Sequence, residues 1–428
     1  MSPAVKLPPG ATLAVALQWD AATSVPVGRL AMHDRRVLFE YNAAFLKQGV
    51  DISPLRLPRQ PGVIETRDPL FETLPGVFND SLPDGWGRLL LDRFARRQGA
   101  APETLTPLDR LAHVGQDGMG ALVYQPEFAK DDAEEMVDLD EVAASSRSVL
   151  DGTSDAVLEH LRKLGGSPQG ARPKVLVQVE AATGRVTDAL HDRGPGWRQV
   201  IVKFAAQDDV ADIGPVELAY ARMATAAGVK MPETLLLPSA SGHGYFAAVR
   251  FDRSGAARHG AEHHGPARLH AATASGLLHA DHRLPALDYM TLAKLAVRLT
   301  QDHREGEALF RLMAFNVFAH NRDDHAKQFS FLLDRAGVWR LAPAYDLTFS
   351  RGPGGEHTTS VAGEGRAPST DAMLKVADAA GLTPGKALEI LEQTRAAVLR
   401  WREFAEAAAV TQWTATAIWA TVGRNGRL

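Results

Sequence analysis

Two aspartates mark the part of the sequence where residues able to do chemistry are concentrated. Asp323 lies in a charged turn after an apolar helical run, and Asp346 comes after a short apolar strand predicted at 329–333. In kinases, one aspartate accepts the proton of the attacking hydroxyl, and a later aspartate holds Mg²⁺ against the phosphates. The order helix, acidic turn, strand and second acid therefore favours a phosphoryl-transfer site, although a solvated turn would explain any single charged residue.

The amide side chain expected beside these aspartates is a glutamine. Gln328 stands five residues after Asp323, where kinases have a metal-binding asparagine. Glutamine carries its amide oxygen on one more methylene, so it reaches the same metal only if the loop withdraws by roughly 1.5 Å. Because Mg²⁺ demands octahedral geometry, we expect Asp346 and Gln328 to bind the metal, with slower transfer or a changed metal preference as the consequence.

A lysine and a glutamate upstream have the order of a phosphate-binding pair. Lys203 lies in the apolar strand predicted at 198–204, where an unpaired ammonium group would be costly to bury. Glu217 lies near the start of an amphipathic helix predicted from Pro215. In kinases such a lysine contacts the α- and β-phosphates and pairs with a glutamate of the next helix. The alternative for Glu217 is an acid that interacts favourably with the helix N-terminus.

A glycine-rich loop, residues 165–170, precedes the lysine strand. It lies between a helix predicted at 154–164 and a strand beginning near Lys174. Missing side chains let backbone N–H groups approach phosphate oxygens closely. The loop lacks the ending of a Walker A motif, so taken alone it fits a plain turn as well as a phosphate cradle. In a second glycine-rich stretch, 115–120, a tight turn before a strand is favoured over an anion cradle.

Composition places the chain among soluble globular proteins. Hydrophobic residues make up 45% of the 428 residues and charged residues 23%, which suits two or three domains. The net charge of −4 gives no overall field that would attract nucleic acid. The absence of cysteine excludes disulfides and thiol chemistry and suits a reducing cytoplasm. We find no signal peptide at residues 1–10 and no apolar run of about 18 residues, so we expect a cytoplasmic protein with no membrane contact.

The predicted elements change in character along the chain. Strands are expected at 12–17, 27–32 and 37–41, and an acidic linker with a short helix at 127–155. The C-terminal half is mostly helical. Its helices are expected at 289–299, 305–319, 370–380, 384–406 and 411–421.

The passage between the β-rich and helical parts is expected to act as a hinge. Strands predicted at 234–237 and 244–253 form a hairpin, and we nominate Val249 and Phe251 as hinge residues that read an adenine edge. A glycine- and histidine-rich stretch follows at 254–268. Because glycine and proline there disfavour a helix, we expect a mobile loop rather than a histidine metal site.

The motifs together resemble the HipA serine/threonine kinases, the toxins of bacterial type II toxin–antitoxin pairs. The resemblance covers nearly the whole chain, and its two specific parts are Asn321 to Ser330 and Ala342 to Leu347. Weaker matches appear in the family's order at 82–85, 118–122, 165–174, 250–253, 278–281 and 287–289. The family pattern ends in an asparagine where this chain has Gln328.

The resemblance implies a fold and a set of roles. The fold is α+β, a bilobal protein-kinase-like (HipA-like) fold with a small N-terminal β-subdomain and an α-rich C-terminal lobe. The expected ranges are 1–126 for the N-terminal subdomain and the start of the N-lobe, 127–253 for the N-lobe and 254–428 for the C-lobe. Asp323 is the catalytic residue, Asp346 and Gln328 bind Mg²⁺, and ATP is the cofactor. The residues expected to bind ATP are Gly165, Gly166, Ser167, Gly170, Ala171, Lys203, Glu217, Val249, Phe251, His325 and Lys327.

The resemblance also implies regulation and partners. Ser167 falls on the loop serine that such kinases autophosphorylate in trans, which ejects the loop because a phosphate is repelled by the nucleotide phosphates. The expected partners are a small helix-turn-helix antitoxin (HipB-like), DNA only through that antitoxin, and a protein substrate such as an aminoacyl-tRNA synthetase. The alternatives are a nucleotide-binding pseudokinase, favoured by Gln328, a small-molecule phosphotransferase and, more distantly, a metal nuclease.

Overall fold

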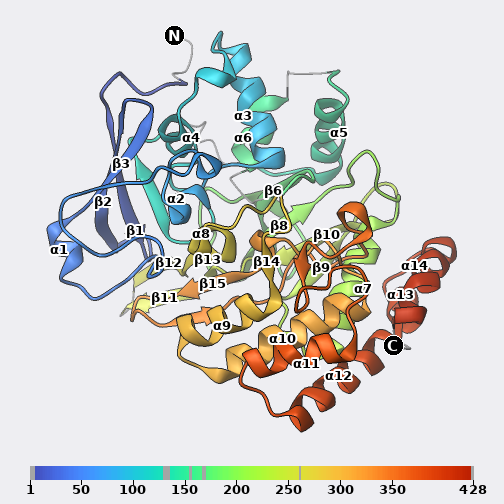
Figure 1. Cartoon of the computed structure of the whole chain (residues 1–428). Coiled ribbons are helices and arrows are strands. Elements are labelled where there is room, and N and C mark those ends of the chain that lie inside the picture. Colours follow the sequence, from blue (N-terminus) through green and yellow to red (C-terminus); the bar gives the residue numbers. More distant parts are fainter. Residues whose placement is uncertain (1–4, 129–134, 154–156, 166–169, 260–261, 426–428) are drawn as a thin grey trace. The chain divides into compact units, whose positions relative to one another are not determined.

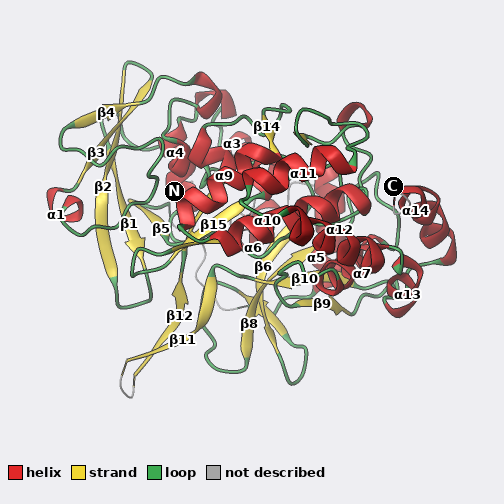
Figure 2. Cartoon of the chain, turned by 60° about the horizontal axis from the view of Figure 1, so that its bottom comes forward, coloured by secondary structure: helices red, strands yellow, loops and turns green. Residues whose placement is uncertain are grey.

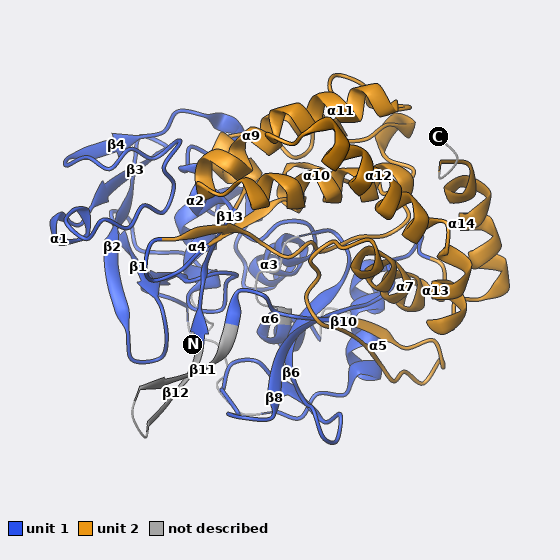
Figure 3. Cartoon of the chain, turned by 90° about the horizontal axis from the view of Figure 1, so that it is seen from below, with its two compact units in different colours: residues 1–209, 247–272, 333–337 blue, residues 210–246, 273–332, 338–428 orange. Residues whose placement is uncertain are grey.

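The structure is a computed structural model, and it describes residues 5–128, 135–153, 157–165, 170–259 and 262–425 (Figure 1). The chain divides into two compact units, which Figure 3 colours separately. The first unit consists of residues 1–209, 247–272 and 333–337. The second unit consists of residues 210–246, 273–332 and 338–428. The three ranges predicted from the sequence stay a prediction.

The first unit begins with a five-stranded sheet in the order β4-β3-β2-β1-β5 (Figure 2). Its strands are β1 (Thr12–Gln18), β2 (Ser24–His33), β3 (Arg36–Tyr41), β4 (Val63–Glu65) and β5 (Leu122–Gln125). Leu13, Val15 and Leu17 are buried while alternate residues of β1 are more exposed, which is the period-2 pattern of a strand with one face in the core. The three N-terminal strands predicted from this pattern are confirmed.

A second sheet in the first unit carries the lysine strand. Strand β8 (Trp197–Lys203) lies between β6 (Lys174–Glu180) and β10 (Tyr245–Val249), and β7 (Val186–Asp188) pairs with the outer side of β6. Valines fill one face of this sheet. Four of them are fully buried: Val175, Val177, Val200 and Val202. Because side chains alternate along a strand, Lys174 and Lys203 belong to the opposite face.

Helices and a hairpin complete the first unit. They are α1 (Ala43–Leu46), η1 (Pro69–Phe71), α2 (Gly76–Asn79), α3 (Gly85–Arg97), η2 (Pro102–Thr104), α4 (Pro107–Val114), α5 (Leu139–Leu150), α6 (Leu158–Gly165), β11 (Arg253–His259) and β12 (Glu262–Arg268). The acidic linker therefore contains a helix, α5, longer than the segment expected there. The expectation of a loop at 254–268 is wrong, because β11 and β12 pair as an antiparallel hairpin with two register shifts. The shifts absorb residues that fit a regular strand poorly, which is why composition suggested a loop.

A buried ion cluster follows β10. The Asp252 carboxylate is fully buried and accepts hydrogen bonds from Arg250 at 3.0 and 2.8 Å and from the Gly120 N–H at 2.7 Å. Burial alone would raise the pKa of Asp252, but the guanidinium groups of Arg250 and Arg253 outweigh it and hold that pKa well below its usual value. Arg250 also donates to the Gly118 carbonyl at 3.1 Å. The glycine-rich turn at 115–120 thus holds an internal carboxylate and guanidinium.

The second unit is mostly helical. Its elements are α7 (Ile213–Ala226), β9 (Thr234–Leu237), α8 (Ala274–Leu278), β14 (Leu287–Asp288), α9 (Tyr289–Thr300), α10 (His303–Phe318), η3 (Ala326–Gln328), β16 (Trp339–Leu341), η4 (Pro353–Gly355), β17 (Thr359–Ser360), α11 (Thr370–Ala379), α12 (Pro384–Val398), α13 (Trp401–Ala407) and α14 (Gln412–Asn425). Strands β10, β13 (His270–Thr273) and β15 (Ser330–Leu333) contain the points where the chain passes from one unit to the other.

Helix α10 is the core of the second unit. It packs against α9 and α12, and its apolar residues from Leu309 to Phe318 are almost fully buried. The long helix predicted at 384–406 is divided into α12 and α13. The Leu399 N–H still donates to the Arg395 carbonyl at 3.0 Å, but the Arg400 N–H donates to the Ala397 carbonyl at 3.1 Å, which makes a turn between the two helices. Among the described residues, no helix is long and apolar enough to cross a membrane.

Candidate functional site

The charged turn begins where α10 ends in a left-handed residue. His320 has a φ of 56°, the Asn321 N–H donates to the Asn316 carbonyl at 2.9 Å, and the His320 N–H donates to the Val317 carbonyl at 3.4 Å. This pair of bonds is a Schellman motif, in which the position usually taken by glycine is occupied by histidine. The helix therefore stops at a defined point, which sets the position of Asp323 three residues later.

The turn is fastened on both sides of Asp323 to a later segment of the same unit. Backbone bonds join Arg322 N–H to the Ser350 carbonyl at 3.3 Å and Thr358 N–H to the Arg322 carbonyl at 3.3 Å. The Arg322 guanidinium also donates to the carbonyls of Gly355 and Arg366. Asp323 itself has an exposed side chain. An exposed carboxylate on an immobilised backbone is the arrangement that a general base requires.

The neighbouring acid, Asp324, is fully buried and holds this segment in place. One of its oxygens accepts from the Thr358 and Thr359 N–H groups at 2.8 and 3.3 Å. The other accepts from the Tyr289 hydroxyl at 2.7 Å and lies 2.8 Å from Nδ1 of His357. Because every contact of Asp324 is structural, the structure separates the two adjacent aspartates into an exposed acid and a buried anchor.

The predicted metal ligands lie next to each other. Nε2 of the Gln328 side-chain amide donates to Oδ2 of Asp346 at 3.5 Å, so the amide nitrogen, and not the oxygen, faces the carboxylate. Asp346 has a φ of 59°, a left-handed conformation that aspartate tolerates better than most residues. Tyr345 donates to the Lys327 carbonyl, and its hydroxyl lies 2.7 Å from the Ser330 hydroxyl. The second acid is thereby held beside the turn that follows Asp323.

The donor set fits magnesium. Mg²⁺ in nucleotide sites is typically held by one or two protein oxygens, with phosphates and waters completing its octahedron. Asp346 and Gln328 provide one carboxylate and one amide, both partly exposed. Among the described residues no group of three or more acidic, histidine or cysteine side chains that could hold a metal ion is present. His325 and Lys327 flank the pair, with Lys327 buried and His325 partly exposed.

Helix α7 is attached to the start of the same turn. The Tyr220 hydroxyl donates to the Ala319 carbonyl at 2.8 Å, directly before His320. Glu217 lies three residues before Tyr220 on α7, which places both side chains on one helix face, and both are buried. At the helix N-terminus, Asp212 accepts from the Thr411 N–H and the Thr414 hydroxyl, each at 2.8 Å. The pairing of Glu217 with Lys203 joins the two units and stays a prediction.

In the first unit, two lysines face each other across a strand pair. Lys174 of β6 is the direct register partner of Lys203 of β8. Like charges in such a pair repel, because opposite positions bring the Cβ atoms within about 5.5 Å. Lys174 is buried, and a Cβ on Gly170 would overlap its ammonium group. The Lys174 ammonium group therefore lies beside the Gly170 backbone, and the sequence reasoning assigned no role to Lys174.

The end of the glycine-rich loop is clamped to the start of α3. The Gly170 N–H donates to the Asp84 carboxylate at 2.7 Å, and the Trp86 N–H donates to the Gly170 carbonyl at 3.0 Å. Gly85 has a φ of 42°, and a Cβ there would come within 2.5 Å of the Gly170 carbonyl oxygen. Asp84 is the N-cap residue of α3, but its carboxylate makes no capping hydrogen bond and binds Gly170 instead.

The remaining predicted residues are placed as follows. Gly170 and Ala171 follow the loop and precede β6, and Gly165 ends α6. Gly166 and Ser167 lie outside the described residues. Val249 ends β10 opposite Val200, and Phe251 follows it, with Arg250 between them anchored to Gln199 and Gly118. Within the second unit, Asp323, His325, Lys327, Gln328 and Asp346 are brought together. That these residues and Lys203 form one site stays a prediction.

Comparisons with known proteins identify relatives. The family model described as the HipA-like C-terminal domain matches residues 166–401, and that described as the HipA N-terminal domain matches residues 21–125. A comparison with curated proteins finds no match. The solved structure titled as the HipA, HipB and operator DNA complex of the Shewanella oneidensis MR-1 toxin–antitoxin system covers 97% of this chain and 95% of that chain, with 16% identity and a TM-score of 0.68. The Helicobacter pylori proinflammatory kinase CtkA covers 54% of this chain and 86% of that chain, at 10% identity and a TM-score of 0.28.

These findings define the class of protein as one with a HipA-like fold of mixed α and β structure, which confirms the predicted fold class. The C-terminal family model alone matches more than half of the chain, and the N-terminal model matches the sheet before it. The chain therefore belongs to the HipA family, and the resemblance stated from its motifs is confirmed.

Replacing the buried anchor should destabilise the protein. In Asp324→Asn, one carboxylate oxygen becomes an amide nitrogen that cannot accept from the donors converging on it. We expect the free energy of unfolding to fall by about 2–4 kcal/mol. Urea unfolding of the full chain measures this change, with Asp371→Asn, an exposed acid in the first turn of α11, as the matched control. An Asp324→Asn protein that unfolds at the wild-type urea concentration would contradict the anchoring role.

The histidine at the helix end should make stability depend on pH. Burial, with Arg322 adding to it, lowers the pKa of His320 from 6.5 to about 4, and its Nδ1 lies 2.9 Å from the Asn425 amide nitrogen. The unfolded chain therefore binds a proton that the folded chain does not between about pH 6.5 and 4, so stability falls as pH falls through this window and His320 adds no further loss below it. The contribution is on the order of 2 kcal/mol.

His320→Asn should remove this part of the pH dependence while keeping the left-handed conformation, which asparagine tolerates. Chemical unfolding at a series of pH values would show a shallower loss than in the wild type. A residual slope is expected from His270, because burial lowers its pKa also to about 4. Identical slopes in the two proteins would show that His320 does not titrate as described.

Proposed function

We propose that this HipA-family protein is an ATP- and Mg²⁺-dependent serine/threonine protein kinase that acts as a growth-inhibiting toxin. The observation that carries the proposal is the set of three side chains in the second unit: Asp323 exposed on an immobilised turn, with Gln328 and Asp346 adjacent to each other beside it. General-base and metal-binding groups in this order are what phosphoryl transfer requires.

Each residue has a defined task in this scheme. Mg·ATP, when bound, supplies the γ-phosphoryl group. Asp323 orients the substrate hydroxyl and accepts its proton, so that the serine or threonine oxygen forms the new bond to phosphorus as ADP leaves. Asp346 and Gln328 hold the metal. Lys203, with Lys174 opposite it, neutralises phosphate charge, which is the main requirement of a loose transition state.

The remaining residues position the nucleotide and the catalytic groups. We assign Gly165 to Ala171 to covering the phosphates, Val249 and Phe251 to the base, and His325 and Lys327 to the phosphate side of the metal. Glu217 orients Lys203. Tyr220, on the same helix face as Glu217, connects α7 to the turn that carries Asp323. This connection is a physical route by which the helix position affects the catalytic acid.

The proposal extends to regulation and partners. Ser167 is the autophosphorylation site, because a phosphate there would be repelled by the phosphates of the nucleotide. A small helix-turn-helix antitoxin, HipB-like, is proposed as the partner through which the protein reaches DNA. The substrate is a translation protein, such as an aminoacyl-tRNA synthetase, and the site of action is the cytoplasm. Family membership supports these assignments.

A second candidate function is nucleotide binding without transfer. Gln328 favours it, because its longer side chain places the amide in contact distance of Asp346, where the metal would have to lie between them. A pseudokinase would bind ATP and a partner but transfer phosphate slowly or not at all. Gln328→Asn separates the two candidates: a large gain in transfer rate would show that glutamine restrains the enzyme, and an unchanged, ordinary rate would remove the pseudokinase reading.

Removing either aspartate should abolish phosphoryl transfer while leaving the fold intact. We expect Asp323→Ala and Asp346→Ala each to lower the rate by at least about 10³-fold, since each group acts directly on the reacting atoms or the metal. Intact-mass spectrometry of purified protein before and after Mg·ATP, followed by peptide mapping, measures the gain of phosphate at Ser167. Circular dichroism and urea unfolding check the fold.

Control variants distinguish lost chemistry from lost structure. Asp334→Asn changes an exposed turn acid that accepts from the Ala336 N–H, and it should keep wild-type phosphorylation. Full activity in Asp323→Ala would overturn the assignment of the general base. Phosphate incorporation at residues other than Ser167, lost in Asp323→Ala, would support the kinase but not the self-inhibition site.

A further inference from the structure

The turn that carries Asp323 is paired with a segment that brings an exposed arginine beside it. The Ser350 N–H donates to the His320 carbonyl at 3.0 Å, and the Arg322 N–H donates to the Ser350 carbonyl at 3.3 Å. These bonds form a parallel bridge, and neighbouring chains in such a bridge lie about 4.8 Å apart. Arg351 follows Ser350 directly and therefore stands alongside the turn.

The end of α14 brings a second arginine to the same turn. The Asn425 side-chain nitrogen lies 2.9 Å from Nδ1 of His320 and donates to the Val317 carbonyl at 3.4 Å. Arg424 directly precedes Asn425 in the last turn of the helix. Because Arg351 and Arg424 both adjoin residues that are bonded to His320, their backbone positions are fixed relative to the turn.

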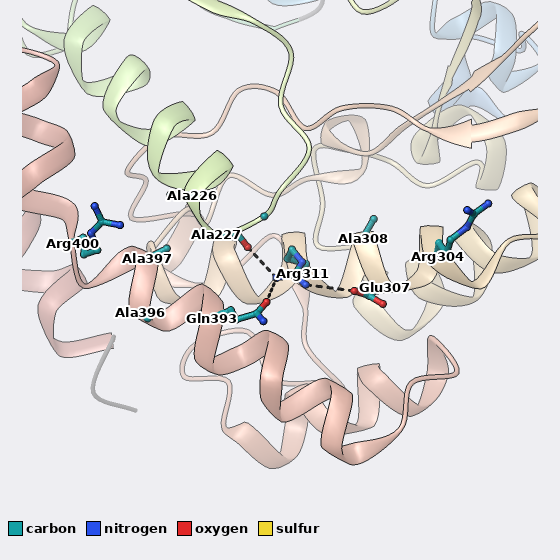
Figure 4. Close-up of a pocket in the computed structure, with 11 residues that line it drawn as sticks. Ala226, Ala227, Arg304, Glu307, Ala308, Arg311, Gln393, Ala396, Ala397 and Arg400 are labelled. Carbon is teal, nitrogen blue, oxygen red and sulfur yellow. Dashed lines mark hydrogen bonds and ion pairs between the residues drawn. The ribbon is translucent and has the colours of Figure 1, made fainter.

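Arg351 and Arg424, which we call the arginine pair, are both exposed. Within the described part of the chain, neither side chain takes part in an ion pair or a hydrogen bond. The arginines at the open cavity between α10 and α12 differ in this respect (Figure 4). Each of those already has a carboxylate partner: Arg311 with Glu307, Arg304 with Asp302 and Arg400 with Glu403. A guanidinium can bind a carboxylate through two parallel hydrogen bonds, and the arginine pair still has this capacity.

Arg322 adds a positive charge that is held in place. Its guanidinium donates to the carbonyls of Gly355 and Arg366. The acids that act on its charge are Asp324 and Glu356. The Asp324 carboxylate is satisfied by the donors described above, and the Glu356 carboxylate pairs with the Arg366 guanidinium at 2.9 Å. In the part of the structure that is described, neither acid is an ion-pair partner of the arginine pair.

The pKa of His320 reflects a local excess of positive charge. Burial lowers this pKa from 6.5 to about 4, and four nearby basic groups act in the same direction. They are Arg322, His357, Arg351 and Arg424. The start of the turn is therefore a positively charged surface on a chain whose net charge is −4, and such a surface attracts acidic groups.

A substrate segment whose hydroxyl reaches Asp323 also passes the arginine pair. An extended chain spans about 3.3 Å per residue, so residues about two to four positions from the acceptor lie about 7–13 Å from it. The bonds that hold the arginine pair are made at His320 and Arg322, within three residues of Asp323, which corresponds to the same range.

We propose that the arginine pair recognises acidic residues of the substrate, so that the acceptor is a serine or threonine with glutamate or aspartate about two to four positions away. This inference deepens the proposed kinase function and rests on it for the role of Asp323. Peptide is favoured over nucleic acid, because two arginines give no continuous basic track for a phosphate backbone and the neighbouring acid is placed to accept a hydroxyl proton.

Binding is tested with synthetic peptides and the full-length protein. A fluorescein-labelled peptide with one central serine between glutamate–alanine repeats is compared with its glutamine and lysine counterparts. Fluorescence anisotropy is measured at about 50 mM salt, where surface charges are incompletely screened. We expect the wild type to bind the glutamate peptide at least about tenfold more tightly than the glutamine peptide. The double variant Arg351→Glu/Arg424→Glu should instead bind the lysine peptide most tightly, because reversed charges attract a reversed ligand.

The matched control is Arg298→Glu, which should keep the wild-type preference. Arg298 is exposed in the last turn of α9 and, like the arginine pair, has no ion pair among the residues described. The reversed preference of the double variant guards against misfolding, since a damaged protein does not gain affinity for the lysine peptide. The inference is overturned if the wild type binds the glutamate and glutamine peptides equally, if the double variant does not prefer lysine, or if an oligothymidylate binds more tightly than the glutamate peptide.

Phosphoryl transfer to the same peptides separates this inference from the proposed function. Mass spectrometry after incubation with Mg·ATP measures phosphate on the central serine of each peptide and on Ser167. Phosphorylation without a preference for the glutamate peptide would overturn the inference and leave the kinase function standing. Selective binding of the glutamate peptide, with no phosphate gained at either position, would keep the recognition surface and overturn the kinase function.

Discussion

The buried carboxylate of Asp324 is the interaction on which the catalytic half of the structure depends. It binds two backbone N–H groups and a histidine ring of residues 357–359 and the hydroxyl of Tyr289 at the start of α9. The tyrosine in turn accepts from Asn316 of α10, whose side-chain oxygen accepts from Asn321. A buried charge is tolerated only when it is satisfied in this way. The network therefore restricts the backbone next to Asp323. The position of the exposed Asp323 carboxylate is set by the buried Asp324 beside it.

A different constraint governs the first unit. There, like charges are brought together instead of opposite ones, because the register of β6 and β8 places Lys174 opposite Lys203. The Gly170 backbone fits against Lys174 and is itself held by Asp84 and Trp86. The register therefore puts two positive charges at opposite positions of one strand pair, a placement that residue types alone do not show. In the proposed chemistry these lysines compensate phosphate charge, and Asp323, Asp346 and Gln328 of the second unit provide proton acceptance and metal binding.

Residue types and local spacing in the sequence were enough for some predictions. Features that depend on strand register or on contacts between distant residues were overlooked. The strands of the first sheet follow a clear alternation of buried and more exposed residues, so they were predicted, whereas the roles of Asp323 and Asp346 stay a prediction. Lys174 was overlooked because its importance comes from strand register, which no local pattern shows. The bond between Asp84 and Gly170 could not be predicted because the two residues are distant in sequence. The hairpin at 253–268 was predicted as a loop because glycine and proline there disfavour a helix, and the bulges that accommodate these residues in strands are visible only in the pairing.

The division of the chain into discontinuous units has a consequence for synthesis on the ribosome. The first unit needs residues 247–272, which supply most of β10 and the Arg250–Asp252 cluster, and these are made only after α7 of the second unit. A nascent chain that ends at residue 209 has three strands of the lysine sheet, β6, β7 and β8, without β10, which pairs with β8. Neither unit is complete when synthesis reaches residue 209, and a product truncated there lacks parts of both units. For a protein proposed to inhibit the cell that makes it, activity is thus postponed until nearly the whole message has been translated.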